Sequence, residues 1–210
     1  MNIYDYTTSG GKNLIMEYVE DLPAPSKAEI LAVRQLIREK GVHAFSLLVT
    51  RQLYKKLWEI KISQERVMYV IQNQESVFFL NICKKQKGKA EKQELKKAIK
   101  RAKLKDFSDR RIKMAFIKAD LDKELEKLNE LVNDNEDAKK AYEAFQKRIA
   151  LQEQLIQIRK AENMTQTDVA NAAGLSQQAV SRIEKGSGAT INSLIKYLTG
   201  IGYCIQFKKI

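Results

Sequence analysis

The chain has 210 residues, enough for one large domain or two small ones, and 44% of them are hydrophobic, as in proteins with a buried core. No apolar run is long enough to cross a bilayer, and the first residues lack the order of a secretory signal, so we expect a cytoplasmic protein without a membrane partner. Cys83 and Cys204 fit no disulfide or metal-ligand spacing, in agreement with a reducing compartment.

The net charge of +12 is concentrated in the first half of the chain. Residues 1–113 contain 24 Lys and Arg against 13 Asp and Glu, whereas residues 114–210 contain 14 against 13. A basic first half favours a polyanionic partner, most often nucleic acid, although a surface tuned only for solubility gives the same composition.

The beginning of the chain predicts a strand over Asn2–Tyr6 and helices over Gly10–Leu22 and Ser26–Glu39. The second helix has Ile30, Val33, Leu36 and Ile37 at helical spacing. Ser26 is its predicted N-cap, with Glu29 completing a capping box, and Gly41 follows its end.

Three runs rich in β-branched and aromatic residues then predict strands over Leu57–Ile62, Arg66–Gln72 and Val77–Cys83. The gaps between them are short and polar, so we expect an antiparallel meander. In the first strand Trp58, Ile60 and Ile62 alternate to one face, whereas Glu59 and Lys61 point to the other. A basic helix over Lys89–Lys105 follows, and its narrow apolar stripe consists of Leu95, Ala98, Ile99 and Ala102.

The composition changes near Ser108–Lys113, and Met114 lies at the change. Asp120–Asp137 holds eight acidic residues and two lysines, with Leu121, Leu125, Leu128 and Val132 on one helical side. A longer helix is predicted from about Glu136 to Ala161. The sequence leaves open whether the two halves are a natural fusion or two joined chains.

The last part of the chain predicts two short helices joined by a tight turn. Thr165 is a predicted N-cap with Asp168 returning a bond to it, Gly174 suits the positive φ of a C-cap, and Ser176 caps the next helix. The small core is predicted from Val169, Ala170, Leu175, Val180 and Ile183, to which a last helix adds Ile191, Leu194, Ile195 and Leu198.

The stretch TQTDVANAAGLSQQAVSRIEKG resembles the lambda-repressor-like (XRE) helix-turn-helix family. On the second helix, amide and guanidinium groups can pair with purine edges in the major groove, and Gln166 is placed to contact a phosphate. The alternative is a small helical bundle with polar surface residues. The predicted DNA-binding residues are Thr165, Gln166, Ser176, Gln177, Gln178, Ser181, Arg182 and Lys185.

The basic half lacks the usual sets of catalytic residues. His43 is predicted to lie in a loop. Because it is the only histidine of the chain, a two-histidine ribonuclease mechanism is excluded. No Cys/His cluster, glycine-rich phosphate loop or Ser–His–Asp set is present, so we expect neither a metal nor a cofactor. Lys84–Lys105 alone holds 11 basic residues against two acids.

About Leu53 to Lys105 is similar to the RelE/ParE superfamily, and most closely to its phage-derived HigB-type toxins. The similarity rests on LWEIKI, on Arg66 and Tyr69, on an apolar strand running into KKQKGK, and on a helix with Glu94, Ala98 and Arg101. Cys83, where an aromatic residue is common, and Asn81, at a position that is often histidine, depart from the pattern.

The resemblance implies a ribosome-dependent mRNA endonuclease whose cations stabilise the charge that builds up when a 2′-hydroxyl attacks the adjacent phosphate. Arg66 would clamp the phosphate, Lys84 and Lys85 would stabilise the transition state or protonate the leaving oxygen, and Glu59 would be the general base or only an ion-pair partner. The predicted catalytic residues are Arg66, Lys84, Lys85, Glu59 and Lys61. The predicted RNA-binding residues are Lys87, Lys89, Lys96, Lys100 and Arg101.

A HigB-like domain beside a HigA-type XRE domain is the arrangement of a toxin–antitoxin module. The expected fold is an α+β RelE-like domain with a small antiparallel sheet, residues 1–113, followed by an all-α helix-turn-helix half, residues 114–210. That half comprises an acidic helical segment, 114–150, the helix-turn-helix, 151–202, and a short C-terminal tail or strand.

The expected partners of the first half are the ribosome and mRNA. The second half is expected to neutralise the toxin through its acidic segment, to bind operator DNA as a dimer on a palindrome, and to repress its own operon. Two alternatives remain open: a transcriptional regulator whose first domain is a non-catalytic interaction module, and a gyrase-targeting ParE-like toxin.

Overall fold

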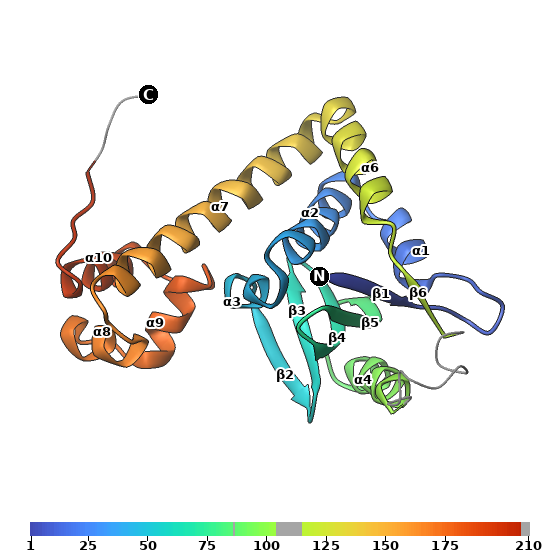
Figure 1. Ribbon diagram of the computed structural model, residues 1–210, viewed down its shortest axis with the longest axis horizontal. Coiled ribbons are helices and arrows are strands. Elements are labelled where there is room, and N and C mark those ends of the chain that lie inside the picture. Colours follow the sequence, from blue (N-terminus) through green and yellow to red (C-terminus); the bar gives the residue numbers. More distant parts are fainter. Residues whose placement is uncertain (86, 104–114, 207–210) are drawn as a thin grey trace. The chain divides into compact units, whose positions relative to one another are not determined.

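The computed structural model describes residues 1–85, 87–103 and 115–206, which fall into two units, Met1–Phe145 and Gln146–Ile210 (Figure 1). Lys113 and Met114, the predicted junction, lie outside the described residues. No helix in the described ranges is long and apolar enough to span a membrane.

The first unit is an α+β domain around a six-stranded sheet. Its strands are β1 (Asn2–Tyr6), β2 (Thr50–Tyr54), β3 (Leu57–Ile62), β4 (Glu65–Asn73), β5 (Ser76–Lys84) and β6 (Phe116–Lys118). Its helices are α1 (Leu14–Glu20), α2 (Ala24–Lys40), the 3-10 turn η1 (Gly41–His43), α3 (Ala44–Leu47), α4 (Lys89–Ala102) and α6 (Leu121–Asp134). The helix α7 (Glu136–Ala161) begins in this unit and ends in the second one.

The strands lie in the order β2-β3-β4-β5-β1-β6. The predicted meander is confirmed, because β2, β3, β4 and β5 pair antiparallel in sequence order. The predicted strand at the N-terminus is also confirmed, but it pairs parallel to β5, so the sheet is mixed. The edge strands β2 and β6 were not predicted, because β2 reads as polar TRQLY and β6 has only three residues.

Both faces of the sheet are covered, with α4 on one face and α2 on the other (Figure 1). The predicted apolar stripe of α4 is confirmed: Leu95, Ala98, Ile99 and Ala102 pack on a cluster formed by residues such as Leu57, Met68 and Leu80. The predicted alternation of β3 holds as well. Because α4 covers the face that carries Glu59, this carboxylate is buried.

The start of α2 differs from the prediction. The helix begins at Ala24 with Pro23 as its N-cap and no side-chain cap, so Ser26 and Glu29 lie inside the helix and form no capping box. A proline in the first turn suits a helix start because its missing N–H has no intrahelical partner there. The predicted end is confirmed, since Gly41 terminates α2 with a φ of 59°.

Residues that follow the predicted junction complete the first unit. The strand β6 pairs with β1, and Phe116 packs in the cluster beneath α4. The helix α6 packs along α2 and inserts Glu124 beside the fully buried Arg34, which also binds Asp5 of β1. The predicted acidic stretch is helical but is divided at Asn135, whose side chain accepts a bond from the Ala138 N–H.

The second unit is all-helical and contains the end of α7 with α8 (Gln166–Ala173), α9 (Gln177–Glu184) and α10 (Ile191–Gly200). The predicted caps are confirmed: Thr165 and Asp168 form a capping box, Gly174 has a φ of 61°, and Ser176 accepts a bond from the Ala179 N–H. The core consists of Leu155, Val169, Ala170, Val180, Ile183, Tyr197, Leu198 and Ile201, with Leu175 and Leu194 at its border.

One part of the predicted core is wrong. Ile191 and Ile195 are 76% and 47% exposed, whereas α10 buries Leu198, as predicted, and Tyr197, which was not predicted. The hydroxyl of Tyr197 has partners inside the core, because the Leu155 carbonyl lies 3.0 Å from it and a Glu184 carboxylate oxygen 2.8 Å, and its single proton can be donated to either. The end of the chain was predicted to be a short tail or a strand; residues 203–206 form no strand, and residues 207–210 lie outside the described residues.

Candidate nucleic-acid interfaces

A pocket of about 560 Å³ opens between α4 and the ends of four strands, and we call it the cationic pocket. All five predicted catalytic residues and Lys87 line it. The complete lining is Arg51, Gln52, Leu53, Glu59, Lys61, Arg66, Met68, Cys83, Lys84, Lys85, Lys87, Glu91, Lys92, Glu94 and Leu95. The structure therefore brings together residues that the sequence places on two strands and a connecting segment.

Strand register explains this convergence. Arg66 of β4 lies opposite Lys61 of β3 on one side and opposite Cys83 of β5 on the other, next to Lys84. The Arg66 guanidinium donates to the backbone carbonyl of Glu65 at 2.6 Å. This bond helps to hold the guanidinium at the pocket, and the remaining N–H donors of Arg66 can bind an oxyanion.

Glu59 is the buried carboxylate of the pocket, and its partner was missed by the sequence analysis. Arg51 of β2 places its Nε 2.9 Å from Glu59 Oε1 and its terminal nitrogen 3.3 Å from Glu91 of α4. Arg51 was missed because its strand has no apolar alternation. The contact between Arg51 and Glu59 follows from the pairing of β2 with β3, which sets the two residues opposite each other.

The remaining polar groups at this end of α4 have structural partners. Asn81 donates to Glu94 at 2.7 Å, and Lys97 donates to the other oxygen of the same carboxylate. Partial burial opposes ionisation, but these bonds outweigh it and hold the pKa of Glu94 below its usual value. Burial, with nearby carboxylates, raises the pKa of Cys83 to about 11, so its thiol stays protonated and unreactive.

The predicted RNA-binding residues of α4 divide into two groups. Lys96 and Lys100 are exposed on the outside of the helix. Arg101 instead faces the sheet, donating at 2.7 Å to the Leu80 carbonyl and to Asn81, with its guanidinium 4.1 Å from the Tyr6 ring centre. Arg101 therefore ties α4 to the sheet, and its predicted contact with RNA stays a prediction. The side chain of Lys89 lies outside the described residues.

In the second unit α9 exposes Gln177, Gln178 and Arg182, as expected for a recognition helix. Ser181 and Lys185 are half-buried, and burial lowers the pKa of Lys185. The hydroxyl oxygens of Thr165 and Ser176 already accept hydrogen bonds from backbone N–H groups at the helix caps. The exposed amides and guanidinium of α9 are therefore the groups of this unit best able to reach base edges.

A buried polar network joins α7, α8 and α9. Arg159 binds Glu184 at 2.5 Å, Gln166 donates to Glu184 at 2.8 Å, and Gln177 donates to Gln166 at 3.0 Å. Burial opposes the charge of Glu184, but the hydrogen bonds from Arg159, Gln166 and Tyr197 hold its pKa below the usual value. The Gln166 amide keeps one N–H for a phosphate.

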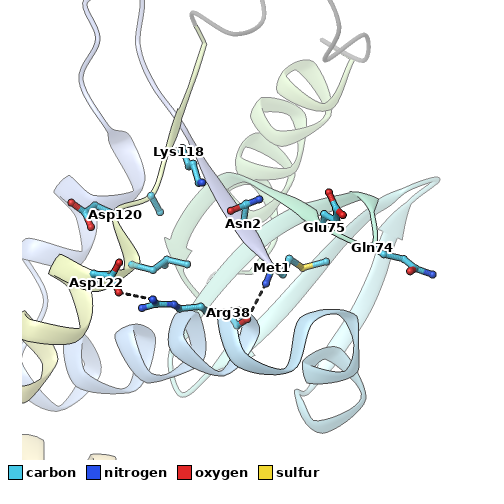
Figure 2. Close-up of a pocket in the computed structure, with 10 residues that line it drawn as sticks. Met1, Asn2, Arg38, Gln74, Glu75, Lys118, Asp120 and Asp122 are labelled. Carbon is cyan, nitrogen blue, oxygen red and sulfur yellow. Dashed lines mark hydrogen bonds and ion pairs between the residues drawn. The ribbon is translucent and has the colours of Figure 1, made fainter.

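Another polar pocket, of about 610 Å³, lies where β1, α2 and α6 meet (Figure 2). Its charged groups are largely engaged within the protein: the N-terminal ammonium donates to the Arg38 carbonyl at 2.9 Å, and Arg38 binds Asp122 at 2.5 Å. No predicted site residue lines it. Across the described ranges, no group of three or more His, Cys, Asp or Glu side chains is arranged to hold a metal ion.

Comparison with known families gives separate matches for the basic first part of the chain and for the helix-turn-helix. A family model described as phage-derived protein Gp49-like matches residues 17–103, and a helix-turn-helix family model matches residues 155–203. None of the curated proteins compared with the chain is significantly similar to it. The first family is toxin-like and the second is of the XRE type, and the pair supports either a toxin–antitoxin fusion or a DNA-binding regulator.

Proposed function

We propose that the chain is a toxin–antitoxin module in one polypeptide, of the HigB–HigA kind. Its first half is a ribosome-dependent mRNA endonuclease that works without a metal. Its second half neutralises the first and binds operator DNA to repress its own operon. We propose a cytoplasmic location, because the proposed partners, ribosomes and operator DNA, are found there and because Cys83 and Cys204 are both free thiols.

The observation that carries the proposal is the cationic pocket. It gathers Lys61, Arg66, Lys84 and Lys85 around a single concave site, with the buried Glu59 in its wall. Fixed cations inside a pocket favour a group whose negative charge grows during the reaction, as on a phosphate under attack. A carboxylate within the same site can act as general base.

The residues support transesterification of RNA. The 2′-hydroxyl next to the scissile bond transfers its proton to Glu59, and its oxygen bonds to phosphorus. Arg66 binds the non-bridging oxygens, whose charge increases. Lys84 or Lys85 donates a proton to the departing 5′-oxygen, so the products are a 2′,3′-cyclic phosphate and a 5′-hydroxyl.

The deciding experiment is single-turnover cleavage on programmed ribosomes, with saturating residues 1–113 whose folding is verified by circular dichroism. Arg66→Ala and Lys84→Ala are each expected to slow cleavage about 100-fold or more, and a chelator is expected to have no effect. Lys96→Gln, which removes an exposed cation outside the pocket, should cause only a modest loss that low salt restores.

Unchanged cleavage rates for both pocket variants would exclude the catalytic role. A folded fragment that cleaves no mRNA would favour the alternative of a non-catalytic interaction module. Inhibition of DNA supercoiling by gyrase in place of mRNA cleavage would favour the ParE-like alternative.

The proposed contact between toxin and antitoxin rests on the acidic helix α6. Glu124 reaches the buried Arg34 of the basic half, and none of the described residues of α6 lines the cationic pocket. Expression of residues 1–113 should arrest growth, and co-expression of 114–210 should relieve the arrest. Glu124→Ala in 114–210 should weaken relief, whereas Asp122→Ala, which removes an exposed ion pair, should not. Normal growth with soluble, folded 1–113 would contradict the toxin assignment.

The proposed DNA contacts are made by Gln178 and Arg182 of α9 at base edges and by Gln166, the first residue of α8, at a phosphate. Dimerisation through the second unit is supported by the apolar surface that Ile191 and Ile195 expose on α10. A dimer of this unit would bind a palindromic operator, as symmetric helix-turn-helix proteins do.

A further inference from the structure

A pocket of about 280 Å³ lies at the opposite end of α4 from the cationic pocket, and no role has been assigned to it so far. The hairpin between β2 and β3 forms one wall, β4 the floor, and the last turn of α4 the other wall. Its lining is Tyr54, Lys55, Lys56, Leu57, Val70, Ile71, Gln72, Ile99, Ala102 and Lys103. We call it the hairpin pocket.

An aromatic ring stands at the rim of the hairpin pocket. Tyr54 is 47% exposed and lines the pocket together with Leu57 and Val70. The hairpin that carries it is fixed, because the Gln52 amide donates to the Lys55 carbonyl at 2.6 Å. A held, exposed ring over an apolar floor suits stacking of a flat base.

The charged side chains among the described residues of the hairpin pocket are all lysines. Lys55, Lys56 and Lys103 are exposed, and Lys55 Nζ lies 5.4 Å from the Tyr54 ring centre. Among the described residues, no carboxylate lines the pocket and no ion pair neutralises these lysines. An apolar slot whose described charged residues are lysines fits a ligand that has a flat ring and carries phosphate.

The helix α4 connects this pocket with the cationic pocket. Lys92, Lys96, Lys100 and Lys103 recur at helical spacing, so they lie along one side of the helix. From Lys92 to Lys103 the helix rises about 16 Å, a distance that a few nucleotides of single-stranded RNA can span. Lys92 lines the cationic pocket and Lys103 the hairpin pocket.

We propose that the hairpin pocket is a nucleobase subsite for single-stranded RNA, in which a base stacks on Tyr54 while the α4 lysines hold the backbone that leads to the cationic pocket. This proposal rests on the proposed function of the cationic pocket. It adds a second, sequence-tolerant anchor that fixes the strand a few nucleotides from the scissile phosphate.

The test is binding of two fluorescein-labelled 2′-O-methyl RNAs to the full chain, measured by fluorescence anisotropy at low salt. The methyl group prevents cleavage. A trinucleotide is too short to occupy both pockets and should favour the cationic pocket, which has more cations, whereas a ten-nucleotide strand can reach both. Tyr54→Ala is expected to weaken binding of the long RNA on the order of tenfold and to leave the short RNA unaffected.

Matched variants separate stacking from charge and from folding. Tyr54→Phe keeps the ring and should bind the long RNA like wild type. Lys103→Gln should weaken the long RNA only, whereas Lys139→Gln, an exposed cation on α7, should change neither. Unchanged fluorescence of Trp58, the only tryptophan, verifies that each variant is folded.

Each outcome discriminates. If Tyr54→Ala leaves both affinities unchanged while Arg66→Ala weakens both, the subsite is overturned and the proposed function stands. If Tyr54→Ala weakens only the long RNA and Arg66→Ala weakens neither, the subsite stands and the cationic pocket loses its role. A wild-type chain that binds neither RNA overturns both. Polyglutamate binding with the same dependence on Tyr54 overturns RNA as the occupant.

Discussion

Replacing Arg34 by methionine should destabilise the first unit far more than the same change at Arg38, one helical turn further on. Arg34 is fully buried and makes hydrogen bonds of 2.6–2.9 Å to Asp5 and Glu124. Methionine keeps most of the stem but leaves both carboxylates buried without their cation. Breaking such a buried pair costs about 3–5 kcal/mol, a large part of the stability of an ordinary domain.

Arg38→Met is the matched control, because Arg38 also lies on α2 and also binds an acid of α6. Its side chain is 36% exposed and that of Asp122 is 79% exposed, so water solvates both charges. An ion pair in such a position contributes about 0–1 kcal/mol. The two variants should therefore differ by several-fold in the free energy of unfolding that they lose at neutral pH.

The Arg34→Met loss should also depend on pH. Burial already raises the folded-state pKa of Glu124 above its ordinary value, and loss of the Arg34 cation, which opposes this shift, raises it further. A carboxyl group with a raised folded pKa contributes stability below its unfolded pKa and loses it as pH rises through the folded pKa. The variant should consequently lose less stability near pH 4 than at pH 7.

Urea unfolding of the full chain measures both effects, and fluorescence of Trp58 in β3 reports on the first unit alone, because it is the only tryptophan. A loss for Arg34→Met no larger than that for Arg38→Met would refute the reasoning. So would a large loss that is the same at both pH values.

Three further predictions concern the second unit. Glu184→Gln should destabilise it by about 3 kcal/mol at pH 7, because Arg159 loses its charged partner. The folded-state pKa of Glu184 lies below the ordinary 4.5, so the stability advantage of the wild type should disappear as pH falls through that range. Thermal unfolding of the unit at several pH values measures both effects. Gly200→Ala should cost about 1–3 kcal/mol in the same assay, because its Cβ would lie 2.8 Å from that of Ala173. Arg182→Ala should cost about 1–3 kcal/mol in operator binding and relax specificity at one base pair, as measured by titration against operator variants with single base-pair changes. Equal losses of affinity on all these operators would instead assign Arg182 to phosphate contacts.

The sequence by itself determined those features that depend on local chemistry. Runs rich in β-branched and aromatic residues located β3, β4 and β5, and their short connections predicted the antiparallel order that places Arg66 beside Lys84. The helix-turn-helix was predictable down to its caps, because Thr165, Gly174 and Ser176 act on residues only a few positions away.

The tertiary structure decided what depends on distant partners. Arg51 belongs to the cationic pocket only because a polar edge strand pairs with β3, and Arg101 faces inward only because Tyr6 and Asn81 lie beneath α4. Local pattern could not reveal that Glu124, on an outwardly acidic helix, would be buried against Arg34 of α2. The sequence specifies which side chains are charged, but whether water, RNA or another part of the chain solvates each charge is settled by packing between segments far apart in sequence.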